Sequence, residues 1–172
     1  MIVAGTGHRP DKLGGWDNTS GFYKVVEVAV TALEEQNPKG VVSGVAAGWD
    51  LALAHAAMEL DMHLLCAVPF TGQEKRWSNF WQQLYGEAME YATEVRVLFE
   101  PDMSSKHSVV QALHGRNDWM VNYVKEKKGK ILALWDGSKG GTAHCIRSAD
   151  RAGVEVVNYW NIYSHNSHER QE

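Results

Sequence analysis

The chain has few of the residues that mark special classes of protein. It contains only two cysteines and four prolines among 172 residues. No apolar run approaches the roughly 18 residues that a membrane-spanning helix requires, and no basic stretch with a cleavage site follows Met1. Cys66 and Cys145 give neither a disulfide framework nor the spacing of a zinc site. We therefore expect a cytoplasmic protein with no membrane association, no metal and no separate cofactor.

A strong positive charge is also absent, since 17 Lys and Arg stand against 21 Asp and Glu, for a net charge of -4. A nucleic-acid-binding domain is more often strongly basic, so nucleic acid is an unlikely partner by this measure. The hydrophobic fraction of 44% and the charged fraction of 22% are those of an ordinary globular domain. We expect a single domain over residues 1–163, followed by a polar, frayed tail over residues 164–172.

Short aliphatic runs alternate with helical patterns along the chain, which is typical of βαβ units around a parallel sheet. The expected strands are Ile2–Ala4, Gly40–Val42, His63–Val68, Glu94–Phe99, Lys130–Trp135 and Val154–Asn158. The expected helices cover residues 22–35, 51–60, 74–91, 107–127 and 142–152. This pattern predicts an α/β fold with three layers and a mostly parallel, doubly wound sheet of about six strands. Ligands of such sheets bind beyond the carboxyl ends of the strands.

The first expected strand runs into a glycine-containing turn that ends at Pro10. Glycine lets a ligand approach the backbone closely, and free N–H groups together with an arginine can hold a phosphate. The third glycine of a dinucleotide-binding fingerprint is missing, so an ordinary strand-to-loop turn is the alternative. The ligand contacts expected from this turn are Gly5, Thr6, Gly7, His8 and Arg9.

Two more glycine-rich turns, over residues 43–50 and 135–142, lead from expected strands into helices. A helix N-terminus presents free N–H groups and the positive end of its dipole, so both turns suit an anion. Asp50 is either a helix cap or an acceptor for a sugar hydroxyl. The ligand contacts expected from these turns are Ser43, Gly44, Gly48, Asp50, Gly140, Gly141 and Thr142.

Arg116 interrupts an apolar helical stripe formed by Val109, Leu113 and Met120. Charged residues are almost never buried without a partner, so Arg116 either extends to the rim of the fold or points at an anion. Asn117 beside it can read a base or a ribose. We include both Arg116 and Asn117 among the expected ligand contacts.

Aromatic residues are the unusual feature of the composition, with seven tryptophans. Four of them lie in or near the turns described above, which predicts stacking on a base. Other aromatic side chains recur at spacings of three and four over residues 74–91. That stripe is either core or a contact in a homo-oligomer. The four tryptophans are Trp49, Trp77, Trp119 and Trp135.

Together, these motifs resemble the YspA-like branch of the SLOG superfamily, and the run over residues 43–57 is similar to the DNA-processing protein A (Smf) domain. The residues that carry the resemblance are Gly7-His8-Arg9-Pro10, Pro69-Phe70, Arg116-Asn117 and Trp135-Asp136-Gly137 with Gly140-Gly141-Thr142-Ala143. The resemblance implies a Rossmann-like domain that binds a nucleotide or a nucleotide-derived small molecule, as a ligand sensor.

The resemblance also extends to the LOG phosphoribohydrolases, which cleave a nucleoside monophosphate at the base–sugar bond. Their GGxGTxxE motif ends in a glutamate that is taken as catalytic, and Cys145 stands at that place here. Glu74, Asp50 and His8 are the candidates to replace it. A nucleoside monophosphate N-glycosidase or deoxyribosyltransferase is therefore the alternative function. Binding of single-stranded DNA through the basic run over residues 125–130 ranks lowest.

Overall fold

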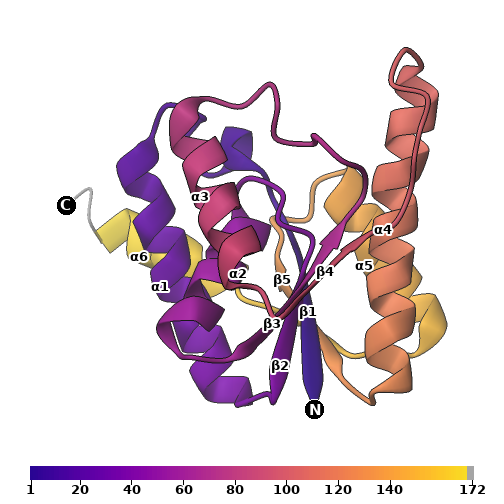
Figure 1. Ribbon diagram of the computed structural model, residues 1–172. Coiled ribbons are helices and arrows are strands. Elements are labelled where there is room, and N and C mark those ends of the chain that lie inside the picture. Colours follow the sequence, from indigo (N-terminus) through magenta and orange to yellow (C-terminus); the bar gives the residue numbers. More distant parts are fainter. Residues whose placement is uncertain (170–172) are drawn as a thin grey trace.

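The computed structural model describes residues 1–169, and within them six strands form one parallel sheet in the order β4-β3-β2-β1-β5-β6 (Figure 1). All five strand pairs are parallel. The expected α/β, doubly wound architecture is confirmed. The strands are β1 (Ile2–Gly7), β2 (Gly40–Ser43), β3 (His63–Val68), β4 (Glu94–Val97), β5 (Lys130–Leu134) and β6 (Val156–Asn158).

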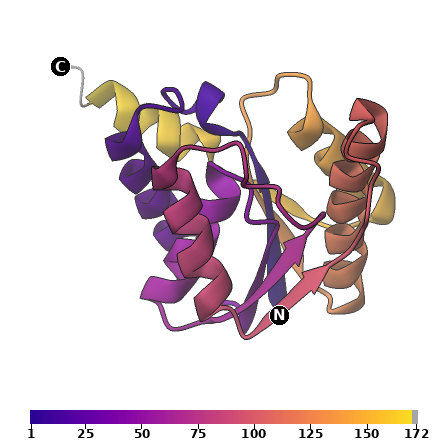
Figure 2. The same ribbon diagram turned by 45° about the horizontal axis from the view of Figure 1, so that its top comes forward.

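Helices cover both faces of this sheet, so the domain has three layers (Figures 1 and 2). Helices α1, α2, α3 and α6 lie on one face, and α4 and α5 lie on the other. Each face has its own apolar core, one rich in side chains of α1 and α2 and the other centred on α4 and α5. The helices are α1 (Thr19–Gln36), α2 (Trp49–Glu59), α3 (Asn79–Tyr91), α4 (Lys106–Glu126), α5 (Gly141–Ala152) and α6 (Trp160–Glu169), with a short 3₁₀ helix at Pro10–Lys12.

Helix α3 begins five residues later than the aromatic pattern suggested. Residues 71–77 form turns instead, and the Gln82 side chain donates to the carbonyl oxygens of Glu74, Lys75 and Trp77. The aromatic stripe of α3 is packed inside the molecule, where Trp81 is 2% exposed. Leu84 and Tyr85 of that stripe are buried as well, which supports the core interpretation, while Trp77 and Phe80 are half-buried and a homo-oligomer stays a prediction.

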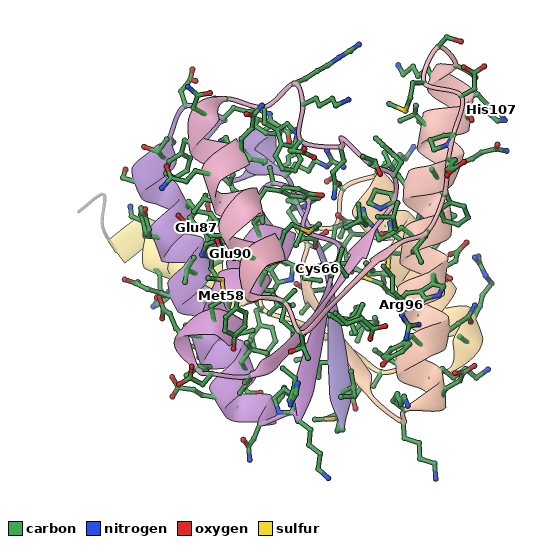
Figure 3. The ribbon with its side chains drawn as sticks, in the orientation of Figure 1. Met58, Cys66, Glu87, Glu90, Arg96 and His107 are labelled. Carbon is green, nitrogen blue, oxygen red and sulfur yellow. The ribbon has the colours of Figure 1, made fainter. Side chains whose placement is uncertain are left out.

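The topology creates a crevice beside β1. Strands β2, β3 and β4 follow one another on one side of β1. After α4, strand β5 pairs with β1 on its other side. Ligands bind at such reversals in doubly wound sheets. The first half of α4 extends past the carboxyl ends of the strands, and His107 lies near that outer end (Figure 3). This part of α4 forms a wall above the crevice.

Helix α6 occupies much of the segment expected to be a frayed tail. It continues to Glu169, while residues 170–172 lie outside the described part of the chain. Trp160 and Tyr163 of α6 pack against the core cluster that contains α1. No helix in the described range is long and apolar enough to cross a membrane.

Candidate functional site: a cavity at the carboxyl ends of β1 and β5

A cavity of about 380 Å³ lies at the carboxyl ends of β1 and β5, against α4. Four parts of the chain supply its walls: the turn after β1, the start of α2, the middle of α4 and the turn before α5. Ten of the expected ligand contacts line it, namely Thr6, Gly7, His8, Arg9, Asp50, Arg116, Asn117, Gly140, Gly141 and Thr142. Further lining residues are Asp11, Lys12, Ala46, Val110, Leu113, His114, Ser138 and Lys139.

Two glycines of the first turn make room for the neighbouring helix α2. A Cβ on Gly7 would lie 2.5 Å from the indole ring of Trp49, and a Cβ on Gly5 would lie 2.6 Å from Leu53. Trp49 is fully buried, and its indole N–H donates to the Leu132 carbonyl at 3.0 Å. Gly5 does not line the cavity, so its absent side chain serves packing between β1 and α2.

Three expected contacts in the second turn, Ser43, Gly44 and Gly48, hold the turn together and do not line the cavity. The Ser43 hydroxyl donates to the Asp50 carbonyl at 2.7 Å and accepts from the Val45 N–H at 3.0 Å. Gly48 has a φ of +100°, and a Cβ there would collide with the His8 carbonyl. These residues therefore act on the site only through the position of Asp50 and its neighbours.

Asp50 and Arg116 are both buried in the cavity wall. Burial raises the pKa of Asp50 to about 6, although the charges of Arg116 and Arg9 and the amide of Ala46 act in the opposite direction. Arg116 donates from Nε to the Asn117 side-chain oxygen and from Nη1 to the Gly44 carbonyl, both at 2.8 Å. The guanidinium is thus fixed in the wall and does not extend to the rim of the fold, while its contact with an anion stays a prediction.

The third turn brings the start of α5 to the cavity. Gly140 is the N-cap with a φ of +142°, and no side chain accepts from the first N–H groups of the helix. Gly141 and Thr142 occupy the first turn, and Lys139 precedes the cap. Free N–H groups and the helix dipole therefore face a cavity that also contains cationic side chains.

His8 contacts the turn after β5. Its Nε2 lies 2.8 Å from the carboxylate of Asp136 and 3.0 Å from the backbone N–H of the same residue. Hydrogen bonds from Ser138, and then the contact with His8, lower the pKa of Asp136. The ring of Trp160 meets His8 edge-on at 5.6 Å. His8 is thus a fixed element of the cavity wall with an ionised carboxylate behind it.

Glu74 and Cys145 do not line the cavity. Glu74 lies in the turns after β3, where its carbonyl accepts from Gln82. Cys145 is fully buried, and burial raises the pKa of its thiol to about 11. A neutral, buried thiol is a poor nucleophile, so Cys145 is a packing residue. Of the three candidate replacements for the missing glutamate, Asp50 and His8 are in the wall.

The prediction that tryptophans stack on a ligand is wrong for this cavity, because none of the seven lines it. Trp49 belongs to the core, and Trp119 packs on Tyr123 with a ring separation of 5.1 Å. The guanidinium carbon of Arg96 lies 5.5 Å from the Trp119 ring, beside α4 (Figure 3). The indole of Trp135 instead donates to the Ser138 carbonyl.

Several wall residues were not found from the sequence. Lys139 and Ser138 belong to the turn over residues 135–142, from which only Gly140, Gly141 and Thr142 were expected as contacts. His114 lies on α4 three residues before Asn117, so the spacing that identified Arg116 and Asn117 could also have indicated it. Its ring stacks on that of His144, with centroids 4.2 Å apart. Burial, and then the nearby His144, lower the pKa of His114.

Comparisons with known proteins agree with this fold. No family model matches the chain. The chain is 27% identical over 142 residues to the uncharacterized SPbeta prophage-derived protein YoqJ of Bacillus subtilis, covering 74% of this chain and 79% of that protein. It is 23% identical over 171 residues to a UPF0398 protein of Bacillus thuringiensis. That match covers 94% of this chain and 89% of the relative.

Two solved structures share the architecture. DNA processing protein A (DprA) of Streptococcus pneumoniae superposes with a TM-score of 0.62 at 16% identity, over 98% of this chain and 56% of DprA. The structural-genomics target TM1055 superposes with a TM-score of 0.56 at 14% identity. That match covers 90% of this chain and 71% of TM1055. The chain thus spans little more than half of the DprA structure. These two likenesses show a Rossmann-like α/β fold, while membership of the SLOG superfamily and of its YspA-like branch stays a prediction.

Proposed function

We propose that the cavity binds a nucleotide or a nucleotide-derived small molecule, with a phosphate group at the start of α5. The observation that carries this proposal is the meeting of free N–H groups at the start of α5 with four cationic side chains in one cavity. Two carboxylates, Asp11 and Asp50, line the same walls, so cations outnumber acids. The cations are Arg9, Lys12, Arg116 and Lys139.

The size and lining of the cavity support a small organic anion. A volume of about 380 Å³ falls within the range of roughly 300–1,000 Å³ that is usual for ligand sites. Val110 and Leu113 provide apolar surface, while Asn117 and Thr6 provide polar groups that can fix orientation. A phosphate with an attached sugar and base combines the same features: a charged end, hydrogen-bonding groups and an apolar face.

Calorimetry with AMP, ADP, ADP-ribose and a cyclic dinucleotide tests the proposal. At least one of them is expected to bind, and Lys139→Ala or Arg9→Ala should each weaken that binding about tenfold, since a charged hydrogen bond is removed. Lys125→Ala is the matched control, because Lys125 is exposed in the last turn of α4 and does not line the cavity. Failure of all four ligands to bind would contradict the proposal.

Hydrolysis of an N-glycosidic bond is a second candidate, favoured by Asp50. A buried carboxyl with a pKa of about 6 in a cavity wall has the character of a general acid. The bond between C1′ and the base nitrogen would break, water would supply a hydroxyl to C1′, and the base nitrogen would gain a proton. Chromatographic detection of free base from the common nucleoside monophosphates tests this. Asp50→Asn should abolish base release, and no release from any nucleotide would leave binding without turnover.

The name of DprA refers to DNA processing, but the basic run of this chain does not support a DNA site at the cavity. Residues 125–130 close α4 and open β5, at the amino ends of the strands. The cavity lies at the opposite ends of those strands. The two positive regions therefore do not form one continuous surface, and a small ligand is favoured over a polymer.

A further inference from the structure

Asp50 and Arg116 are a buried acid and a buried base that face one cavity without forming a salt bridge. Asp50 is 7% exposed and Arg116 is 3% exposed, and both line the cavity wall. Each influences the ionisation of the other through its charge. Arg116 nevertheless directs its hydrogen bonds to Asn117 and Gly44. The two charged groups are therefore near each other but separated.

Both groups have hydrogen-bonding capacity left over. The Oδ1 atom of Asp50 is buried and has no hydrogen-bond partner. A guanidinium has five N–H groups, and the structure gives protein acceptors to one on Nε and one on Nη1 of Arg116. Buried polar atoms are almost always paired, because an unpaired one destabilises the fold. An unpaired carboxylate oxygen in a cavity wall therefore indicates a group that comes from outside the protein.

We propose that Asp50 and Arg116 together bind one ligand group in which a hydrogen-bond donor stands beside an acceptor. The donor of that group reaches Asp50 Oδ1, and its acceptor receives from the free N–H groups of Arg116. This inference rests on the proposed function, because it concerns the same cavity. Two parts of a nucleotide have this chemistry: the 2′,3′-diol of the ribose, and the edge of a base that carries an amino group beside a ring nitrogen.

The start of α5 and the Asp50–Arg116 pair then have separate tasks. The free N–H groups of α5, with Lys139, hold the charged end of the ligand. Asp50 cannot take part in that contact, because a carboxylate repels a phosphate. A buried acceptor also selects strongly, since an analogue without the donor leaves Oδ1 of Asp50 unpaired in the complex. The pair therefore selects the ligand, while α5 and the lysine supply charge attraction.

Three probes separate the two sources of the donor. AMP carries both the diol and the amino group, 2′,3′-dideoxy-AMP lacks the diol, and purine riboside 5′-monophosphate lacks the amino group. In the parent protein, the probe that lacks the contacting group should bind about tenfold more weakly than AMP or worse. In Asp50→Asn this difference should become much smaller, because a charged carboxylate is replaced by a neutral amide that keeps one, weaker acceptor oxygen. Asp150→Asn, which changes an exposed carboxylate of α5 that does not line the cavity, should leave the difference in place.

Arg116→Lys provides a second variant that keeps the positive charge but removes the planar fork. It should also reduce the difference between AMP and the weaker probe. If all three probes bind the parent with equal affinity and Asp50→Asn changes none of them, Oδ1 holds only a water molecule and this inference is wrong, although nucleotide binding stands. If no probe binds at all, the proposed function fails for these nucleotides and takes this inference with it.

Discussion

Replacing Asp50 by asparagine should stabilise the ligand-free protein at neutral pH. Burial raises the pKa of this carboxyl from its ordinary value of 3.8 to about 6. The folded chain therefore holds the proton more tightly than the unfolded chain does, and ionisation of Asp50 opposes folding. Each pH unit between those two values contributes ~1.4 kcal/mol, so the ionised carboxylate lowers the free energy of unfolding by about 3 kcal/mol. Asparagine resembles the protonated, neutral side chain and avoids that loss.

The sign of the effect defines a pH window. Between about pH 4 and pH 6 the folded state binds more protons than the unfolded state at Asp50, so its contribution to stability decreases as the pH rises. Urea denaturation followed by circular dichroism, at steps from pH 4 to pH 8, measures the free energy of unfolding of both proteins. The advantage of Asp50→Asn should grow up to about pH 6 and stay constant above it.

A matched control removes the general effect of losing one negative charge. Asp150 is an exposed carboxylate on α5, so Asp150→Asn changes the net charge equally without touching the cavity. Its difference from the parent should show no comparable growth between pH 4 and pH 6. If Asp50→Asn is less stable than the parent at pH 7, or if the difference is the same at all pH values, the reasoning about burial is refuted.

Three other substitutions test the turns around the cavity. Gly140→Ala places a side chain at a φ of +142° and should lower the stability measured by thermal denaturation by about 1 kcal/mol. Gly141→Ala should be neutral, because Gly141 has open space around it and an ordinary φ. Equal effects of the two substitutions would contradict this. Gly7→Ala places a Cβ against Trp49 and should lower stability by about 1–3 kcal/mol with a red shift of tryptophan emission, and an unchanged spectrum would argue against that packing. Asp136→Asn removes a carboxylate whose pKa is lowered in the folded protein, so the variant should be less stable than the parent at neutral pH. This difference should disappear as the pH falls below 4. A difference that persists in acid would have another cause.

The order of the six strands and of helices α1 to α5 was predictable because each of them has a strong local signal. The five expected helices and six expected strands are all present, with ends that coincide or differ by at most five residues. Helix α3 starts late because a side chain within the helix, Gln82, stabilises the preceding turns. Helix α6 was missed because residues 164–169 are polar. Its anchors are Trp160 and Tyr163, which pack on a core that exists only in the folded molecule.

The candidate site was predictable in place but less so in detail. Glycine-rich turns at strand ends located the cavity, because parallel strands bring their carboxyl ends together. The sequence could not tell whether an absent Cβ makes room for a ligand or for protein. At Gly5 the space belongs to Leu53, and at Gly44 it belongs to Arg116. The same ambiguity misplaced the tryptophans, since an indole such as that of Trp49 suits a core as well as a binding surface.

Stability and binding are opposed at Asp50. A folded domain gains nothing from a buried carboxylate whose Oδ1 has no partner, and the nearby charge of Arg116 compensates only in part. The balance changes when a donor enters the cavity, because the ionised carboxylate then has the hydrogen bond that the protein withholds. Asparagine at this position should therefore separate the two properties, giving a protein that is more stable alone and less able to select a ligand. A leucine or alanine in the same wall would not separate them as cleanly, since it would also alter the packing around Arg116.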